Sequence, residues 1–269
     1  MQRIGRDVPF PEDGYPGAYL VEIAGLIPED EGRLWLAKPP EESASAFGEF
    51  ALDHIIRWIR SDLDGFGVVF DNYFRESALH AAGGGIERML EIFKSGNAVY
   101  EDDGALWFRS TVHGDEKDRV LVRSDGTPTY FLADAAYHLD KFRRGYSRVI
   151  DIFGPDHHGH IARLKAAAAV FGAPYDWLDV MTVQWVRLVE DGRQVKMSKR
   201  GGEFETLGSL VEDVGSDASK FFFLMRKINA HLDFNLTLAR KSSDENPVYY
   251  VQYAHARICS VIAFAREAG

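Results

Sequence analysis

The sequence predicts an α/β fold, and three features of its pattern support this prediction. A dense β-branched run at 148–154 leads directly into an alanine-rich helical run at 160–172, and an alternating apolar stretch follows at 179–197. Strand, helix and strand in this order form a βαβ unit, whose ligand crevice lies at the carboxyl ends of its strands. A separate mixture of helical and strand patterns at 47–122 predicts a small α+β unit.

The first half of the chain is expected to combine helices, a strand and a hairpin. Residues 1–46 are rich in proline, glycine and acidic residues and contain one short helix near 19–26. From Phe50 the apolar residues recur at helical spacing. The stretch GFGVVFDNYF (65–74) predicts a strand, and GIERMLEIFKSG (85–96) predicts a helix that ends at its last glycine. Asp103-Gly104 between two β-prone runs predicts a hairpin.

The second half of the chain contains the βαβ pattern and then becomes helical. The stretch at 179–197 predicts one long strand that folds back at Asp191-Gly192 and brings the following basic residues to its far end. Helices are expected at 217–229 and from Pro247 onward. Because no stop signal follows the last helix, we expect helical structure to continue beyond residue 269. The predicted division is 1–46, 47–122, 123–245 and 246–269.

Composition excludes several classes of protein. The chain has 269 residues, with 41 Asp and Glu against 31 Lys and Arg, so its net charge of -10 gives no overall attraction to nucleic acid. It has no apolar run long enough to cross a membrane and no secretion signal, which predicts a cytoplasmic protein. Its single cysteine, Cys259, excludes an internal disulfide and a cysteine-based zinc site.

A lysine-rich loop, GRQVKMSKRGG (192–202), is the first candidate site. Lys196 and Lys199 on a glycine-bounded loop suit a phosphate clamp, because ammonium groups are compact charges and Ser198 can donate a hydrogen bond. The alternative is a solvated basic turn. Met197 argues against that alternative, because a thioether gains nothing on an exposed turn.

A second candidate site is FGPDHHGH (153–160), where a strand passes into a helix. Gly154 permits close backbone approach, and Asp156 is placed to accept hydrogen bonds from ribose hydroxyls. The alternative is a metal cluster at His157, His158 and His160. We disfavour it, because adjacent residues of a helix point apart and no further ligands are evident.

A third candidate is the pair Tyr130 and Asp134, which lie four residues apart on one face of an expected helix. A carboxylate and a phenol on one face can hold a guanidinium through its fork of donors, a geometry that a lysine cannot reproduce. The alternative is an Asp that caps its own helix and a Tyr that belongs to the core.

Taken together, these motifs resemble the class I aminoacyl-tRNA synthetases, and in particular the arginyl-tRNA synthetases of bacterial type. Lys196-Met197-Ser198-Lys199 matches the Lys-Met-Ser-Lys signature of that class. The resemblance also rests on DGALWFRST, DRVLVRSDGTPTYF, AYHLDKF, FGPDHHGHIARLKAA, FFFLMRKINAHLDFNLTLA and NPVYYVQYAHARI, in this order and spacing. It covers nearly the whole chain, from GRDVPFPEDGYPGAYLVEIA onward.

The resemblance implies the second half of a class I Rossmann-like nucleotide-binding fold with an α+β insertion and a C-terminal helical segment. It implies ATP-dependent activation of arginine and transfer of the arginyl group to tRNA(Arg), with Mg²⁺ arriving as part of the ATP complex. No tightly bound cofactor and no resident metal are expected. The implied site residues are Lys196 and Lys199 for catalysis, Gly154, Asp156, His157, Val195, Met197 and Ser198 for ATP, and Tyr130, Asp134 and His158 for arginine.

One departure concerns the other signature of the class, His-Ile-Gly-His. Residues 1–46 contain no histidine, so we expect the chain to start after the first half-site and to be inactive alone, its partner being the missing N-terminal half. His157-His158-Gly159-His160 lies only about 35 residues before Lys196, too close for two signatures that bracket the fold, and we interpret it as a decoy. Two alternatives stay open: a nucleotidylyltransferase that uses His157 and His160, and a non-catalytic module that binds tRNA or nucleotide.

Overall fold

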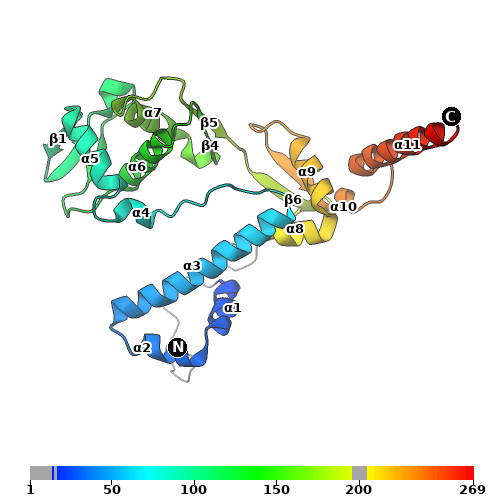
Figure 1. Cartoon of the computed structure of the whole chain (residues 1–269), viewed down its shortest axis with the longest axis horizontal. Coiled ribbons are helices and arrows are strands. Elements are labelled where there is room, and N and C mark those ends of the chain that lie inside the picture. Colours follow the sequence, from blue (N-terminus) through cyan, green and yellow to red (C-terminus); the bar gives the residue numbers. More distant parts are fainter. Residues whose placement is uncertain (1–13, 15–16, 196–204) are drawn as a thin grey trace. The chain divides into compact units, whose positions relative to one another are not determined.

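The computed structural model of the chain describes residues 14, 17–195 and 205–269, which form two compact units (Figure 1). The first unit takes in residues up to 70 together with 187–225 and 233–269, and the second takes in 71–186 and 226–232. Helices and strands occur in both, so the fold is of the mixed α/β kind.

The second unit holds the main hydrophobic core. Its helices are α4 (Ser77–His80), α5 (Gly85–Ser95), α6 (Tyr130–Arg143) and α7 (Ile161–Val170), with 3₁₀ helices η2 (Ser110–His113) and η3 (Pro155–His160). Its strands are β1 (Val99–Asp102), β2 (Ala105–Phe108), β3 (Arg119–Val122), β4 (Val149–Phe153) and β5 (Leu178–Thr182). Phe93, Phe108, Leu132 and Leu164 are fully buried where α5, α6 and α7 pack together.

The βαβ prediction is confirmed in this unit. Strands β4 and β5 pair in parallel, with Val149 opposite Leu178, and α7 connects them. The predicted hairpin is also present, because β1 and β2 pair antiparallel around Asp103 and Gly104, both of which have positive φ. The predicted helix at 85–96 is α5, which ends at Gly96.

The first unit contains seven described helices and a small sheet. Its helices are α1 (Ala18–Leu26), α2 (Glu29–Leu36), α3 (Pro40–Gly65), α8 (Leu207–Val214), α9 (Ser216–Leu224), α10 (Leu236–Ala239) and α11 (Pro247–Glu267). Its strands are β6 (Val186–Glu190), β7 (Arg193–Gln194) and β8 (Leu232–Asn235), in the order β7-β6-β8. Helix α11 begins at Pro247 as predicted, and Asn246 caps it by accepting a hydrogen bond from the Val248 amide.

Two of the expected strands are wrong. Residues 65–74 form no strand; their central side chain, Val69, is 79 % exposed and has no sheet to pack on. The single long strand expected at 179–197 is two strands of different sheets, because the chain leaves β5 after Thr182 and joins a new sheet at Val186. The predicted turn at Asp191-Gly192 is correct, since both residues have positive φ between β6 and β7.

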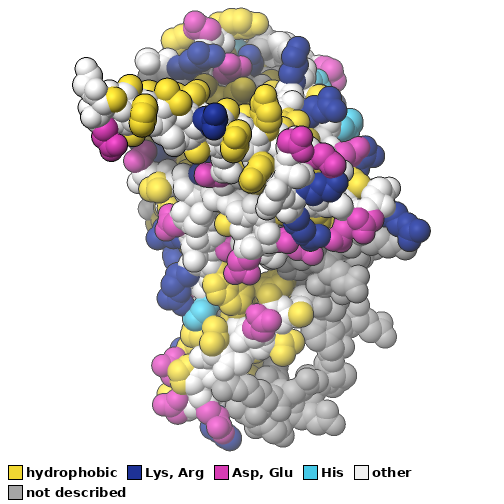
Figure 2. Space-filling model, turned by 90° about the vertical axis from the view of Figure 1, so that its right-hand side faces the viewer, with side chains coloured by type: hydrophobic (Ala, Val, Ile, Leu, Met, Phe, Trp, Pro, Cys, Tyr) yellow, Lys and Arg dark blue, Asp and Glu magenta, His cyan; other side chains and the backbone are white. Residues whose placement is uncertain are grey.

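The surface agrees with the acidic composition. On the face drawn in Figure 2, basic and acidic side chains are interspersed and do not gather into one broad basic field. Within the described part of the chain, no helix has the length and apolarity needed to cross a membrane.

Candidate functional site

A pocket of about 210 Å³ in the second unit is the best candidate for a ligand site. Helix α6 supplies Ala133, Asp134 and Tyr137, and the segment that leads into α4 supplies Phe74 and Glu76, with Leu79 from α4 itself. The rings of Phe74 and Tyr137 stack with their centroids 4.5 Å apart. The pocket therefore combines two carboxylates with an aromatic wall.

Helix α6 is fixed by its cap and by its buried face. The Thr129 hydroxyl accepts a hydrogen bond from the Leu132 amide and donates to the Val120 carbonyl at 2.9 Å, so it ties the start of the helix to β3. Leu132, Ala135 and Ala136 are fully buried in the core. With this face packed, the helix presents the half-buried Asp134 and Tyr137 to the pocket.

The Asp134 carboxylate has no hydrogen-bond or ion-pair partner among the residues that the structure describes. Burial raises the pKa of the Asp134 carboxyl above its ordinary range, and the nearby Glu76 carboxylate adds to the increase. Positive charge at His138 and Arg163 opposes the shift. A half-buried carboxylate without a partner is costly in the empty pocket, and a cationic ligand would remove that cost.

Two residues expected to bind arginine lie outside this pocket. Tyr130 is the first residue of α6 and is 81 % exposed, and it does not line the pocket although Asp134 is one turn away. His158 is exposed on η3 and is likewise not among the lining residues. Of the three residues expected to bind arginine, the structure places Asp134 alone in the pocket.

The residues expected to bind ATP in this unit lie directly after the carboxyl end of β4. A Cβ built on Gly154 would lie 2.6 Å from Asp156 Oδ1, so a larger residue at this position would displace the Asp156 side chain. Asp156 is exposed, and its Oδ2 lies 3.6 Å from His157 Nε2. Gly154, Asp156 and His157 thus lie together at the crevice end of the βαβ unit.

The histidine run does not form a metal site in the described part of the chain, where no group of three or more His, Cys, Asp and Glu side chains could hold a metal ion. His157 and His160 meet edge to face with their ring centroids 5.1 Å apart. Burial, with the charge of Arg163, lowers the pKa of the His160 imidazole, so this ring is neutral at pH 7.

The lysine loop lies outside the described residues, and with it Lys196, Met197, Ser198 and Lys199. Val195 is the last described residue before it. Its amide donates to the Leu188 carbonyl at 2.9 Å, which extends the β6–β7 pairing by one bond beyond the turn. Val195 belongs to the first unit and Gly154 to the second.

Sequence reasoning missed Glu76 and Phe74. Glu76 is exposed, and the one contact of its carboxylate with a described residue is a long one to His80, 3.4 Å between Nε2 and Oε1, so it is available to a ligand. Both residues lie in the stretch before α4, far in sequence from α6, and no local motif marks them. Phe74 is the last residue of the wrongly expected strand and Glu76 is an isolated acid just after it, so neither could be recognised from the sequence.

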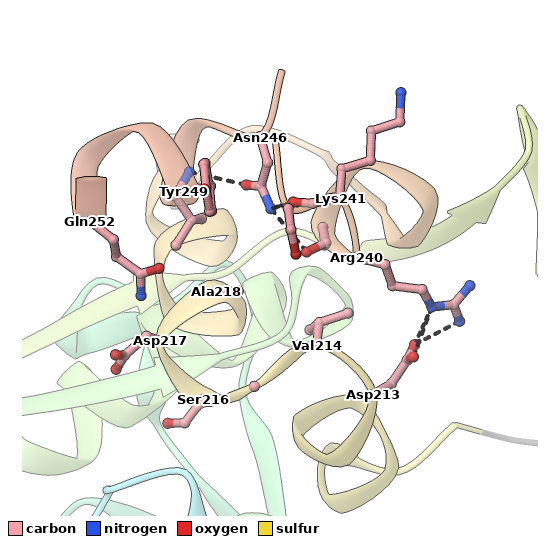
Figure 3. A pocket seen from close by; sticks show the side chains of 14 residues that line it. Asp213, Val214, Ser216, Asp217, Ala218, Arg240, Lys241, Asn246, Tyr249 and Gln252 are labelled. Carbon is pink, nitrogen blue, oxygen red and sulfur yellow. Dashed lines mark hydrogen bonds and ion pairs between the residues drawn. The ribbon is translucent and has the colours of Figure 1, made fainter. Parts of the chain in front are cut away.

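A larger pocket of about 500 Å³ lies in the first unit and is less suited to a ligand (Figure 3). Its most prominent cation, Arg240, is already paired with Asp213 at 2.6 Å and with Glu190. The Asn246 amide nitrogen donates to the Ala239 and Lys241 carbonyls at 3.0 and 2.8 Å. The bonds of Asn246 hold α10 and the start of α11 together, and the main cation of the pocket is already neutralised by its carboxylate partners.

Comparison with known proteins gives a consistent result along the whole chain. An arginine–tRNA ligase of Heliobacterium modesticaldum is 51 % identical over 100 % of this chain and 48 % of its own length, and one from Moorella thermoacetica is 47 % identical with the same coverage. The chain is related over its whole length to the arginyl-tRNA synthetases. No family model matches it. The chain spans about half the length of these synthetases.

Solved structures of arginyl-tRNA synthetases agree. A Campylobacter jejuni structure described as an arginyl-tRNA synthetase superposes with a TM-score of 0.87 at 37 % identity, over 98 % of this chain and 57 % of that one. The Thermus thermophilus arginyl-tRNA synthetase superposes with a TM-score of 0.64 at 20 % identity over 93 % of this chain, a likeness of fold alone. The resemblance inferred from the motifs is therefore confirmed.

Proposed function

We propose that this chain is the part of an arginine–tRNA ligase that recognises the arginine side chain and contributes to the ATP site. The observation that carries the proposal is the pocket on α6, where the half-buried Asp134 carboxylate has no partner among the described residues and Glu76 lies beside it. The stacked Phe74 and Tyr137 rings add an aromatic wall. A planar, always-charged guanidinium fits such a pocket, because it donates to carboxylates as a fork and stacks on aromatic faces.

For ATP, the proposal rests on the βαβ unit. Gly154, Asp156 and His157 follow the carboxyl end of β4, where parallel sheets bind nucleotides. We assign the unit to the second half of a class I Rossmann-like fold, with the β1–β3 region as its α+β insertion and α11 as the start of a helical domain. The family resemblance assigns Lys196, Val195, Met197 and Ser198 to ATP as well, and Mg²⁺ arrives with ATP.

In the proposed reaction, the arginine carboxylate attacks the α-phosphate of ATP, which gives arginyl-adenylate and releases pyrophosphate. A hydroxyl of the terminal adenosine of tRNA then attacks the arginyl carbonyl carbon, and AMP leaves. The protein supplies little covalent chemistry, so positioning and charge stabilisation dominate. Lys199 stabilises the charge that develops on the phosphates, and Tyr130 and His158 approach the amino acid from outside the pocket. The whole reaction belongs to the full-length ligase, of which this chain is about half.

Ligand selectivity tests the arginine site. Isothermal titration of the chain with arginine, citrulline and lysine is expected to give the tightest binding for arginine, by about tenfold or more over each of the others. Citrulline has the same shape without the charge, and lysine has the charge without the fork. Equal affinity for all three ligands would refute the assignment.

The role of Lys199 is tested by arginylation of tRNA with the chain and with a Lys199→Ala variant. Any arginylation activity that the chain shows is expected to depend on this lysine. Robust arginylation that is unchanged in the variant would contradict the role given to the lysine loop.

A further inference from the structure

A buried charge cluster joins helix α6 to strand β4 beside the pocket. Asp151, in the middle of β4, is 7 % exposed. Its Oδ2 accepts from His138 Nε2 at 2.6 Å, and its Oδ1 accepts from Lys141 Nζ at 2.6 Å. One carboxylate therefore holds two basic side chains of α6 that lie one turn apart.

Both basic residues of this cluster, His138 and Lys141, also contact residues that line the pocket. His138 Nδ1 lies 2.7 Å from the backbone carbonyl oxygen of Asp134, one turn back along α6. Lys141 Nζ lies 4.6 Å from the centroid of the Tyr137 ring, a cation–π contact on the ring that stacks against Phe74. Asp151 is thus linked to Asp134 through His138 and to the Tyr137 ring through Lys141.

The His138 ring connects Asp151 to the backbone of Asp134. Both of its ring nitrogens face oxygen acceptors, a carbonyl and a carboxylate, and both contacts are satisfied when both nitrogens carry protons. A positive charge at this place favours the ionised form of the Asp134 carboxyl in the empty pocket.

Burial of these charged groups costs desolvation free energy. Burial of Asp151 alone acts to raise its pKa, and the bonds from His138 and Lys141 overcome that effect so that the pKa of the carboxyl lies below its ordinary range. Apolar side chains of similar volume would pack α6 on β4 without this desolvation. The charged arrangement therefore calls for a role beyond packing.

We propose that Asp151 is a positioning residue for the guanidinium pocket, acting through His138 on Asp134 and through Lys141 on Tyr137. This inference rests on the proposed arginine site, and it adds to that site the residues that orient its walls and set its charge. In metal sites, residues that hydrogen-bond to the ligating side chains without touching the metal orient those side chains. Their loss weakens metal affinity by about 10- to 100-fold.

The test compares arginine affinity among variants of the chain by isothermal titration, with thermal unfolding measured in parallel. Asp151→Asn keeps the shape and removes the charge, and it is expected to weaken arginine binding about tenfold. Asp179→Asn on β5 is the matched control, because Asp179 pairs with Arg148 at 2.7 Å in an exposed ion pair away from the pocket. The control is expected to keep the wild-type affinity.

Two further measurements separate positioning from simple stabilisation. Lys141→Met is expected to weaken arginine binding, and Lys141→Arg, which keeps the charge beside Asp151, to retain most of it. Nitrogen NMR of the His138 ring is expected to show two protonated nitrogens in the wild-type chain and to lose that signature in Asp151→Asn. If Asp151→Asn does not fold, the comparison of the two Lys141 variants decides the question.

The outcomes are distinguishable from those of the proposed function. Wild-type affinity in a folded Asp151→Asn variant, or equal affinity of Lys141→Met and Lys141→Arg, would overturn the positioning role while Asp134→Asn still weakens binding. If Asp134→Asn also leaves the affinity unchanged, or if the wild-type chain does not bind arginine, the arginine site itself is refuted and the positioning role with it.

Discussion

The substitution Asp134→Asn isolates the charge of the pocket from its shape. Asparagine has nearly the same volume as aspartate, so the change creates no cavity and leaves Glu76 and the two stacked rings in place. What is lost is one ionic hydrogen-bonding partner of the guanidinium. Hydrogen bonds to charged groups contribute about 1.5 to 3 kcal/mol, so arginine affinity is expected to fall by roughly 10- to 100-fold.

The effect on stability has the opposite sign. Because the folded state raises the pKa of the Asp134 carboxyl, it favours the protonated form more than the unfolded chain does. The ionised carboxylate therefore costs stability once the pH rises above the ordinary titration range of aspartate, near 3.9. At neutral pH, Asp134→Asn should leave the free energy of unfolding unchanged or increase it, while affinity decreases.

The pH dependence gives a second readout of the same residue. Guanidinium binding requires ionised Asp134, so arginine affinity of the wild-type chain should decrease on acidification, beginning at a higher pH than for an ordinary aspartate. The variant should lack that step. The assay is isothermal titration at a series of pH values from about 8 down to about 4, where ordinary aspartate side chains titrate.

The matched control is Asp140→Asn on the same helix. Asp140 forms an i,i+4 pair with Arg144 at 3.2 Å, is half-buried like Asp134, and does not line the pocket. It should change neither arginine affinity nor its pH dependence. Equal affinity of wild type and Asp134→Asn at pH 7, with both chains folded, would refute the reasoning.

Three stability predictions follow from other parts of the fold, each measured by denaturant unfolding. Asp115→Ala should lower the free energy of unfolding by about 3 to 5 kcal/mol, because it leaves the half-buried Arg119 without its carboxylate partner. In the wild-type chain Arg119 donates hydrogen bonds of 2.6 and 2.7 Å to the Asp115 oxygens. The pKa of Asp115 lies below its ordinary range, so this contribution is present above about pH 4 and is lost as the pH falls through the lowered value; a pH-independent difference from wild type would contradict it. Phe93→Ala should cost about 3 to 5 kcal/mol by opening a cavity against Phe108, whose ring lies 4.6 Å away, and a loss below about 1 kcal/mol would contradict the packing. Asn246→Ala should cost about 1 to 3 kcal/mol, since it removes the α11 cap and leaves two carbonyls without their donor, and an unchanged midpoint would contradict that role.

The parts of the fold that could be predicted from the sequence are those set by local chemistry. Asp103-Gly104 and Asp191-Gly192 supply the positive φ that tight hairpins need, and Gly96 ends α5. The β-branched run at 149–153 and the alanine-rich helix after it are long and regular enough to identify the βαβ unit.

The parts that were missed depend on long-range contacts. The apolar residues at 65–74 have strand propensity, but a segment forms a strand only where another strand can pair with it. None of the described strands pairs with residues 65–74. The run at 179–197 passes from one sheet to another between Thr182 and Val186. Because apolar and polar side chains alternate in the same way before and after this point, the sequence pattern does not reveal the break.

The residues of the candidate site also fall into those that local sequence indicates and those that depend on long-range packing. Asp134 could be found because it lies on a helix with recognisable spacing and chemistry. Glu76 could not, because its meeting with Asp134 depends on how α4 packs on α6. Tyr130 shares the predicted helical face with Asp134, but at the first turn of α6 it faces solvent and does not enter the pocket.

The most direct test of the central claim is a crystal structure of this chain with arginine bound. The account predicts the guanidinium between Glu76, Asp134 and the stacked rings of Phe74 and Tyr137, with its nitrogens about 2.7 to 2.9 Å from the Asp134 carboxylate oxygens. Arginine bound elsewhere on the chain, with Asp134 still unpaired, would contradict it.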